Sequence, residues 1–185
     1  MLYLTFDDGP VPGPTEFVVE ELKKYKAKAT FFCIGDNVRK HPAIFKKVVM
    51  EGHAIGNHTF NHLKGWSTSR QVYLENIKLC NSQFATHNVQ RTTLFRPPYG
   101  RISSSQISAL KNEYQIVMWD VLTHDYSKTI SSDQCLTGSI NATRPGSIIV
   151  FHDSLKAERN LTYVLPEFLA YFSSHGFEFR TLLET

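Results

Sequence analysis

Cysteine is scarce in this chain. Among its 185 residues only Cys33, Cys80 and Cys135 occur, widely spaced and without a Cys-x-x-Cys pair. This pattern predicts neither a disulfide framework nor a thiolate zinc site. Cys33 falls in an apolar run and Cys80 in a helical pattern, which is typical of small buried hydrophobic side chains.

Long apolar runs are also missing. No segment approaches the roughly 20 apolar residues that a transmembrane helix needs, so no membrane span is expected. No secretion signal precedes the first expected strand, which starts at Leu2. Free thiols and the missing leader favour the cytoplasm, although a leader or anchor removed from a longer protein would leave the same sequence.

Basic runs are short and the charge is nearly balanced. The chain has 20 Lys and Arg residues against 17 Asp and Glu, which gives a formal net charge of +3. Lys23-Lys24 and Lys46-Lys47 suit solvated helix faces, so no nucleic-acid partner is expected. No repeat, low-complexity stretch or linker is found, so one domain over residues 1–185 is predicted. No protein partner is indicated.

Short apolar runs alternate with amphipathic stretches along the chain. The runs predict strands at Leu2–Phe6, Ala29–Ile34, His53–Gly56, Thr93–Phe95, Ile116–Val121, Ser147–Phe151 and Phe177–Leu182. Helical periodicity predicts helices at Thr15–Tyr25, Ala43–Glu51, Ser69–Thr86, Ser104–Glu113 and Tyr163–Ser174. Such alternation is typical of a parallel sheet covered by helices. About seven parallel strands in one domain predict an α/β fold, a distorted or incomplete (β/α) barrel with helices outside.

Polar residues gather where these strands end, which is where barrels carry their chemistry. The adjacent acids Asp7 and Asp8 end the first strand. Neighbouring strand residues point to opposite faces, so the two acids are expected to have different tasks. A solvated turn is the alternative, because Asp, Gly and Pro are also the usual turn residues.

His58 and His62 are four residues apart. On a helical turn they would project from the same face, close enough to share one metal ion. Imidazole suits zinc and its neighbours, and Asp8 would complete a facial triad with open positions. Two surface histidines at chance spacing are the alternative for this motif taken alone.

The segment Arg96-Pro97-Pro98-Tyr99-Gly100 follows another expected strand. Arg96 carries a permanent charge that can hold a carboxylate in place. The prolines stiffen the turn, which could aim the Tyr99 backbone N–H into the site as an oxyanion donor. A rigid structural loop with a surface arginine is the alternative.

His152 ends the apolar run Ile148–Phe151. A lone histidine there is more often a satisfied core or edge residue than a catalyst. Its place among the other strand ends favours a catalytic task, and acids within Trp119–Tyr126 could keep it protonated at neutral pH.

Together these segments resemble the polysaccharide deacetylases of carbohydrate esterase family 4. The matching segments are Thr5–Pro10, His58–His62, Arg96–Gly100 and Val150–His152, in the family's order, and the resemblance covers essentially the whole chain. The resemblance implies a distorted (β/α) barrel and metal-dependent removal of N- or O-acetyl groups from sugars.

The resemblance implies that the metal ligands are Asp8, His58 and His62. Zinc is the metal expected from these ligand types, with cobalt, nickel and manganese as alternatives. The implied partner is an acetylated carbohydrate, and chitin oligomers, peptidoglycan N-acetylglucosamine and acetylated xylan all fit. Polymeric substrates favour the cell envelope or the exterior, so the localisation stays open.

A catalytic set is implied as well. Asp7 corresponds to the general base, oriented by Arg96, and His152 to the general acid, tuned by Asp125. Tyr99 corresponds to the backbone oxyanion donor. Base and acid are both needed because an amide nitrogen leaves poorly unless it is protonated.

Two departures from the family pattern affect the substrate groove. The fourth motif, usually Asp-x-x-Asp-Trp, reads Leu122-Thr-His-Asp125-Tyr126, so Tyr126 replaces the substrate-facing tryptophan. Val150 replaces the leucine that usually lines the pocket for the acetyl methyl group. The residues expected to contact substrate are Pro97, Tyr99, Tyr126 and Val150.

Two other functions stay open at this point. One is a non-catalytic sugar-binding module, which loss of Asp7, His152 or a metal ligand would have favoured. The other is a hydrolase of C–N bonds in small cyclic amides or ureides, which a small closed pocket would favour. An open groove would favour a polysaccharide, against which Trp66, Tyr126 and Phe60 could stack.

Overall fold

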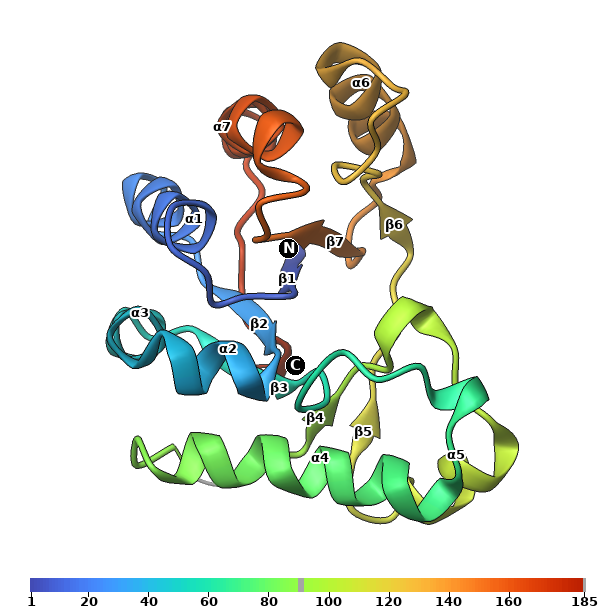
Figure 1. Ribbon diagram of the computed structural model, residues 1–185. Coiled ribbons are helices and arrows are strands. Elements are labelled where there is room, and N and C mark those ends of the chain that lie inside the picture. The colour runs from blue at the N-terminus through green and yellow to red at the C-terminus, as the bar shows by residue number, and fades with distance from the viewer. Residues whose placement is uncertain (90–91, 185) are drawn as a thin grey trace.

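The computed structural model describes residues 1–89 and 92–184, and its seven strands form one curved parallel sheet (Figure 1). The strands are β1 (Tyr3–Asp7), β2 (Ala29–Cys33), β3 (Ala54–Asn57), β4 (Leu94–Phe95), β5 (Gln115–Ile116), β6 (Val121–Leu122) and β7 (Ile148–His152). Their order is β5-β4-β3-β2-β1-β7-β6. Because β5 and β6 are the two ends of this order, the sheet is a half-barrel, which confirms the predicted distorted (β/α) barrel.

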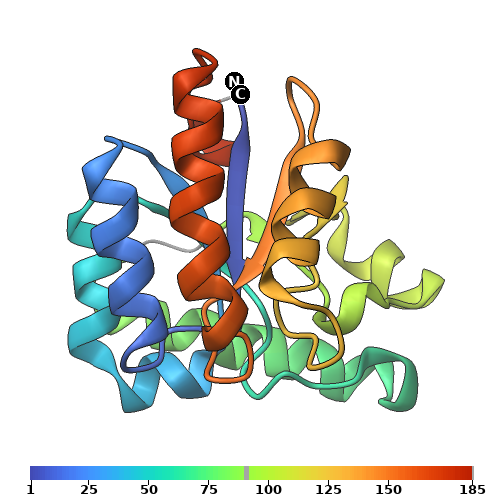
Figure 2. The same cartoon turned by 90° about the horizontal axis from the view of Figure 1, so that it is seen from above.

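Helices cover the outside of the half-barrel, as the two views in Figure 1 and Figure 2 show. They are α1 (Pro14–Lys24), α2 (Gly35–Lys40), α3 (Pro42–Met50), α4 (Arg70–Ala85), α5 (Ser104–Leu110), α6 (Ser132–Ala142) and α7 (Glu158–Ser174). Three short 3₁₀ segments are η1 (Gly65–Ser67), η2 (Pro98–Gly100) and η3 (Leu182–Glu184). Serine caps begin three of the helices: Ser69, Ser103 and Ser131 each accept a hydrogen bond from the first turn.

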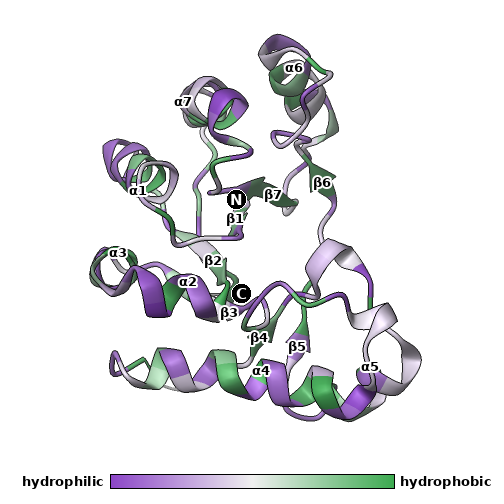
Figure 3. Ribbon diagram, viewed as in Figure 1, coloured by the Kyte–Doolittle hydropathy of each residue, from purple (hydrophilic) through white to green (hydrophobic). Residues whose placement is uncertain are grey.

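The main core lies between the outer face of the sheet and the helices. Phe6 of β1 stacks between Phe31 of β2 and Phe151 of β7, with ring centroids 5.0 and 5.7 Å apart. Phe168 of α7 closes this stack against Phe151. Figure 3 shows hydrophobic residues along the central strands and hydrophilic residues mainly on the helices. The opposite face of β1 is therefore free to carry polar residues into the barrel.

Some predicted elements differ from those observed. The run Ile116–Val121, expected as one strand, is split between β5 and β6, each only two residues long. The run Phe177–Leu182 adds no strand to the sheet, and Phe179 makes only an isolated bridge with Leu2. Helices α2 and α6 were not predicted, because α2 has six residues and α6 is mostly polar.

Two expectations about composition hold in the structure. All three cysteines are free and buried. Within the described ranges, no helix combines the length and the apolar character that crossing a membrane requires.

Candidate active site

A pocket of about 270 Å³ opens at the carboxyl ends of the strands. Eight of the predicted site residues line it: Asp7, Asp8, His58, His62, Tyr99, Tyr126, Val150 and His152. Two more, Arg96 and Asp125, are buried directly behind Asp7 and His152. Pro97 is buried in the turn before η2 and is not among the lining residues. The parallel sheet thus brings together residues that are far apart in the sequence.

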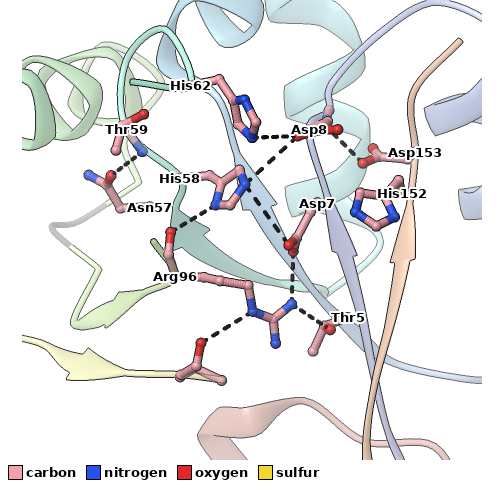
Figure 4. Close-up of polar contacts among 12 residues, drawn as sticks. Thr5, Asp7, Asp8, Asn57, His58, Thr59, His62, Arg96, His152 and Asp153 are labelled. Atoms are coloured by element: carbon pink, nitrogen blue, oxygen red, sulfur yellow. Dashed lines mark hydrogen bonds and ion pairs between the residues drawn. The ribbon is translucent and has the colours of Figure 1, made fainter. Parts of the chain in front are cut away.

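Asp7 is the last residue of β1 and points into the barrel. Its side chain shares this direction with Thr5, since Arg96 contacts both residues (Figure 4). The next residue, Asp8, has a positive φ of 85°, which turns the chain out of the strand. Both acids therefore line the same pocket and do not point to opposite faces of the strand, but their nearest partners differ: Asp7 pairs with Arg96, and Asp8 lies nearest His62.

Arg96 is fully buried and held on every side. Its Nη1 atom donates to Asp7 Oδ1 at 2.8 Å and to Thr5 Oγ1 at 2.7 Å. The remaining nitrogens donate to the carbonyls of Val117 and Met118 in the link between β5 and β6. The guanidinium also lies 4.1 Å from the centre of the Phe32 ring. Such a fixed charge holds the Asp7 carboxylate in one orientation.

The charge of Arg96 decides the protonation of Asp7. Burial by itself raises the pKa of the Asp7 carboxyl, but the nearby positive charges, that of Arg96 foremost, outweigh burial and lower the pKa below its usual range. Asp7 is therefore an ionised, buried carboxylate at neutral pH.

His58 and His62 lie in the loop after β3, not on the helical turn that their spacing predicted. Positive φ angles at Thr59 (64°) and His62 (57°) fold this loop back on itself. The Asn57 side chain supports the fold by accepting a hydrogen bond from the Thr59 N–H. The centroids of the two imidazole rings are 5.1 Å apart. The histidines are therefore as close as predicted, although a folded loop and not a helical turn brings them together.

Asp8, His58 and His62 present three ligand atoms to one point (Figure 4). Asp8 Oδ1 lies 3.4 Å from His62 Nε2 and 3.8 Å from His58 Nε2. Ligands that bind one zinc at about 2.0–2.2 Å are separated by roughly 3–3.5 Å, which these distances approach. The residues present thus fit a divalent cation.

The protonation states of this group also fit a metal. Asp8 Oδ1 is buried and, in the part of the chain described, accepts no hydrogen bond. His58 Nδ1 lies 2.8 Å from the Arg96 carbonyl oxygen, so Nδ1 is the donor and Nε2 is the ring nitrogen that faces Asp8. Burial and the neighbouring His58 lower the pKa of His62 to about 4, so the His62 ring is neutral. A buried carboxylate oxygen without a hydrogen bond, beside two imidazole nitrogens, is a ready cation site.

His152 ends β7 on the other side of the pocket. Its Nδ1 lies 2.8 Å from Asp125 Oδ1, and its backbone N–H donates to Asp125 Oδ2. Burial alone would lower the pKa of His152, but the charge of Asp125 and this hydrogen bond raise it to about 9. The imidazole is therefore protonated at neutral pH. Tyr126 meets the ring edge to face at 5.0 Å.

One pocket thus combines an ionised carboxylate, a protonated imidazole and three side chains that fit a divalent cation, an arrangement that suits hydrolysis. Comparison with protein families matches residues 1–117 to the family described as polysaccharide deacetylase. The chain belongs to the polysaccharide deacetylase family, carbohydrate esterase family 4. It is accordingly a polysaccharide deacetylase, a hydrolase that acts on linear amides.

Known deacetylases are similar to this chain over most of its length. It is 35% identical over 188 residues to a peptidoglycan-N-acetylglucosamine deacetylase of Bacillus cereus, covering 100% of this chain and 87% of that protein. A chitooligosaccharide deacetylase of Azorhizobium caulinodans is 36% identical, and the match covers 82% of this chain and 73% of that protein. A crystal structure of a peptidoglycan N-acetylglucosamine deacetylase superposes with a TM-score of 0.93 at 31% identity. The match covers 99% of this chain and 86% of that structure.

The deacetylase pocket includes residues that sequence reasoning missed. Gly100, Trp119 and Lys156 also line it. Gly100 belongs to the predicted Arg96–Gly100 segment, but only the fold shows that Trp119 and Lys156 reach the same cavity. Phe60, considered as a sugar-stacking residue, instead packs against the main core.

Asp153, a further residue that sequence reasoning missed, holds the turn that carries Asp8 in place. Its fully buried carboxyl accepts hydrogen bonds from the Gly9 N–H at 2.9 Å and from the Thr15 hydroxyl at 2.7 Å. Burial raises the pKa of Asp153 to about 8. A Cβ atom at Gly9 would lie 1.9 Å from Asp153 Oδ2, so no larger residue fits there. Asp153 directly follows the strand end predicted at His152, but the sequence pattern did not reveal this task.

Proposed function

We propose that this deacetylase removes N-acetyl groups from N-acetylglucosamine-containing poly- or oligosaccharides, such as chitooligosaccharide or peptidoglycan, in one catalytic domain over residues 1–185. The observation that carries the proposal is the pairing of Asp7 and His152 across one pocket that also holds the Asp8–His58–His62 group. The names of the similar proteins from Bacillus cereus and Azorhizobium caulinodans support the substrate class.

Asp8, His58 and His62 would hold the divalent metal through Asp8 Oδ1 and the two Nε2 atoms. When bound, such a metal polarises an acetyl carbonyl and lowers the pKa of water. Zinc is the metal we propose from the ligand types, with cobalt, nickel or manganese as alternatives.

Asp7 acts as the general base. Its carboxylate is ionised and its Oδ2 atom lies 3.9 Å from His58 Nε2, on the edge of the proposed metal site. Oδ1 is occupied by Arg96, which leaves Oδ2 to take the proton of the attacking water. Arg96 thus positions the base as well as keeping it ionised.

His152 acts as the general acid from the opposite side. Held cationic by Asp125, it gives its proton from Nε2 to the departing sugar nitrogen. Tyr99 would supply its backbone N–H to the developing oxyanion, and its positive φ of 62° sets the direction of that N–H. Val150 and Leu122 of neighbouring strands, together with Trp119, form the apolar wall against which the acetyl methyl group packs.

The shape of the site favours a polysaccharide over a small cyclic amide or ureide. A second groove of about 580 Å³ lies beside the pocket, and Gly100 lines both. A cyclic amide needs only a closed pocket, whereas a sugar chain needs room on either side of the acetylated unit. A non-catalytic module would not need an ionised Asp7 together with a protonated His152.

The test is acetate release by the purified, metal-reconstituted protein. The panel comprises chitooligosaccharides, peptidoglycan fragments and acetylated xylan, each with and without a chelator. We expect chelator-sensitive acetate from the N-acetylglucosamine-containing substrates. Acetate from xylan alone, or none from any substrate with metal bound, would refute the proposal.

A further inference from the structure

Three aromatic rings near the mouth of the pocket each have a Lys or Arg side chain over the ring face. Lys156 Nζ lies 4.8 Å from the centre of the Tyr126 ring, and Lys64 Nζ lies 5.9 Å from that of Tyr99. The Arg101 guanidinium lies 4.4 Å from the Trp66 ring. We call Lys64, Arg101 and Lys156 the mouth cations. They come from three different loops, those after β3, β4 and β7.

The mouth cations differ from many other surface cations in their partners. Six Lys and Arg side chains form ion pairs with Asp or Glu: Lys23, Lys24, Arg39, Lys40, Lys47 and Arg180. Over residues 1–89 and 92–184, no ion pair is found for a mouth cation. A ring face holds a cation in place but does not neutralise its charge. Each mouth cation therefore keeps its charge available to a ligand.

Acidic residues do not offset this charge at the mouth. The acids lining the pocket are Asp7, which pairs with Arg96, and Asp8, which belongs to the metal-binding group. Among the described residues, the second groove has no acid in its lining. A ligand that reaches the mouth thus meets an excess of positive charge.

The second groove shows where a longer ligand would run. It shares Gly100 with the pocket and is lined by Trp66, Arg101, Ile107 and Met118 among others. Aromatic rings connect this groove with the metal-binding group. The ring centroid of Tyr99 lies 4.5 Å from that of His62 and 5.2 Å from that of Trp66. Trp66 is 40% exposed and Tyr99 52%. Exposed rings of this kind pack against the apolar faces of sugars.

We infer that the mouth cations bind carboxylates on the sugars adjacent to the acetylated unit. The preferred substrate is then an acidic glycan, in which N-acetylglucosamine alternates with a carboxylate-bearing N-acetylhexosamine, as in peptidoglycan strands. Neutral chitooligosaccharides offer the rings the same sugar faces but give the cations no partner. The inference rests on the proposed function and narrows its substrate class.

The test compares one glycan in two charge states. The substrates are a peptidoglycan-derived tetrasaccharide with free lactyl carboxylates and the same tetrasaccharide with those carboxylates amidated. The readout is the ratio of kcat/KM for acetate release from the acidic and the amidated forms. We expect the wild-type ratio to be well above one and to fall as salt is raised.

The triple variant Lys64→Gln, Arg101→Gln, Lys156→Gln should lower this ratio roughly tenfold, the combined effect of three exposed ion pairs. A matched control, Lys26→Gln, Lys46→Gln, Lys78→Gln, removes the same net charge from exposed residues that line neither cavity. It should keep the wild-type ratio. Circular dichroism of both variants verifies that they fold.

A wild-type ratio near one, or equal ratios in the two triple variants, would overturn the inference. In either case acetate would still be released, so the proposed function would stand. Absence of acetate from every N-acetylated glycan would instead refute the proposed function.

Discussion

Asp7 and His152 are direct register partners on the adjacent parallel strands β1 and β7. Side chains at paired positions of a parallel sheet point the same way, so both reach into the pocket. Their protonation states are nevertheless opposite, because Arg96 stabilises the Asp7 carboxylate and Asp125 stabilises the His152 cation. In the proposed mechanism, this one pair of strand ends supplies both the base and the acid that amide hydrolysis needs.

The pH dependence of activity should report His152. The acid is protonated below its pKa of about 9, so activity should fall as pH rises through that value. Asp125→Asn removes the charge that raises this pKa, and burial then lowers it. We expect the alkaline limb of the kcat/KM profile to move down by about two units or more. A profile with an unchanged alkaline limb in Asp125→Asn would contradict this assignment.

Metal binding should depend on His62. Its Nε2 is one of the three proposed ligand atoms, so His62→Ala should lose stoichiometric zinc or raise the Kd for zinc by at least about a hundredfold. The control is His175→Ala, an exposed histidine after α7 that lies outside the pocket. Metal content measured by mass spectrometry after dialysis distinguishes the two. Full zinc occupancy in His62→Ala would exclude it as a ligand.

Stability should depend on the buried pair of Arg96 and Asp7. Arg96→Gln leaves the Asp7 charge buried without its partner, which typically costs about 3–5 kcal/mol of unfolding free energy. The double variant Arg96→Gln, Asp7→Asn removes both charges and should recover part of that loss. Urea unfolding at neutral pH measures both. The pair would have no such role if the single variant lost less than about 1 kcal/mol.

The turn after β1 should tolerate only glycine at position 9. A Cβ there would lie 1.9 Å from Asp153, so Gly9→Ala must displace either the turn or Asp153. We expect a loss of about 2 kcal/mol or more in unfolding free energy and weaker zinc binding, because Asp8 is the preceding residue. The matched control is Gly138→Ala in α6, where no atom lies within 4 Å of the added Cβ. That change should instead stabilise the helix by about 0.5–1 kcal/mol, and equal effects at the two glycines would refute this account of the turn.

The sequence predicted much of the fold because its long strands carry clear patterns. Strands β1, β2 and β7 each have five, mostly apolar residues, and the polar ends of β1 and β7 mark the pocket. Strands β5 and β6 have two residues each, too few for any periodicity to be read. Their boundaries depend on pairing with β4 and β7, which is a property of the assembled sheet.

Prediction of the candidate site was limited because parts of its geometry depend on contacts that form only in the folded chain. The motifs located Asp7, Asp8, His58, His62 and His152, but the loop geometry around His58 depends on Asn57 and on positive φ angles that spacing does not reveal. Asp153 and Lys156 have no motif of their own, because their tasks arise from contacts between distant segments. Phe60 illustrates the converse, since an aromatic residue inside a motif packs into the core.

The measurement that tests the central claim most directly is made on Asp7→Asn. Acetate release and zinc content are determined on the same preparation, beside the wild-type protein. The substitution removes the base but none of the three metal ligands, so zinc should stay stoichiometric while kcat/KM falls by roughly 10²–10⁴-fold. Activity near that of the wild type, with zinc bound, would contradict the assignment of Asp7 as the base.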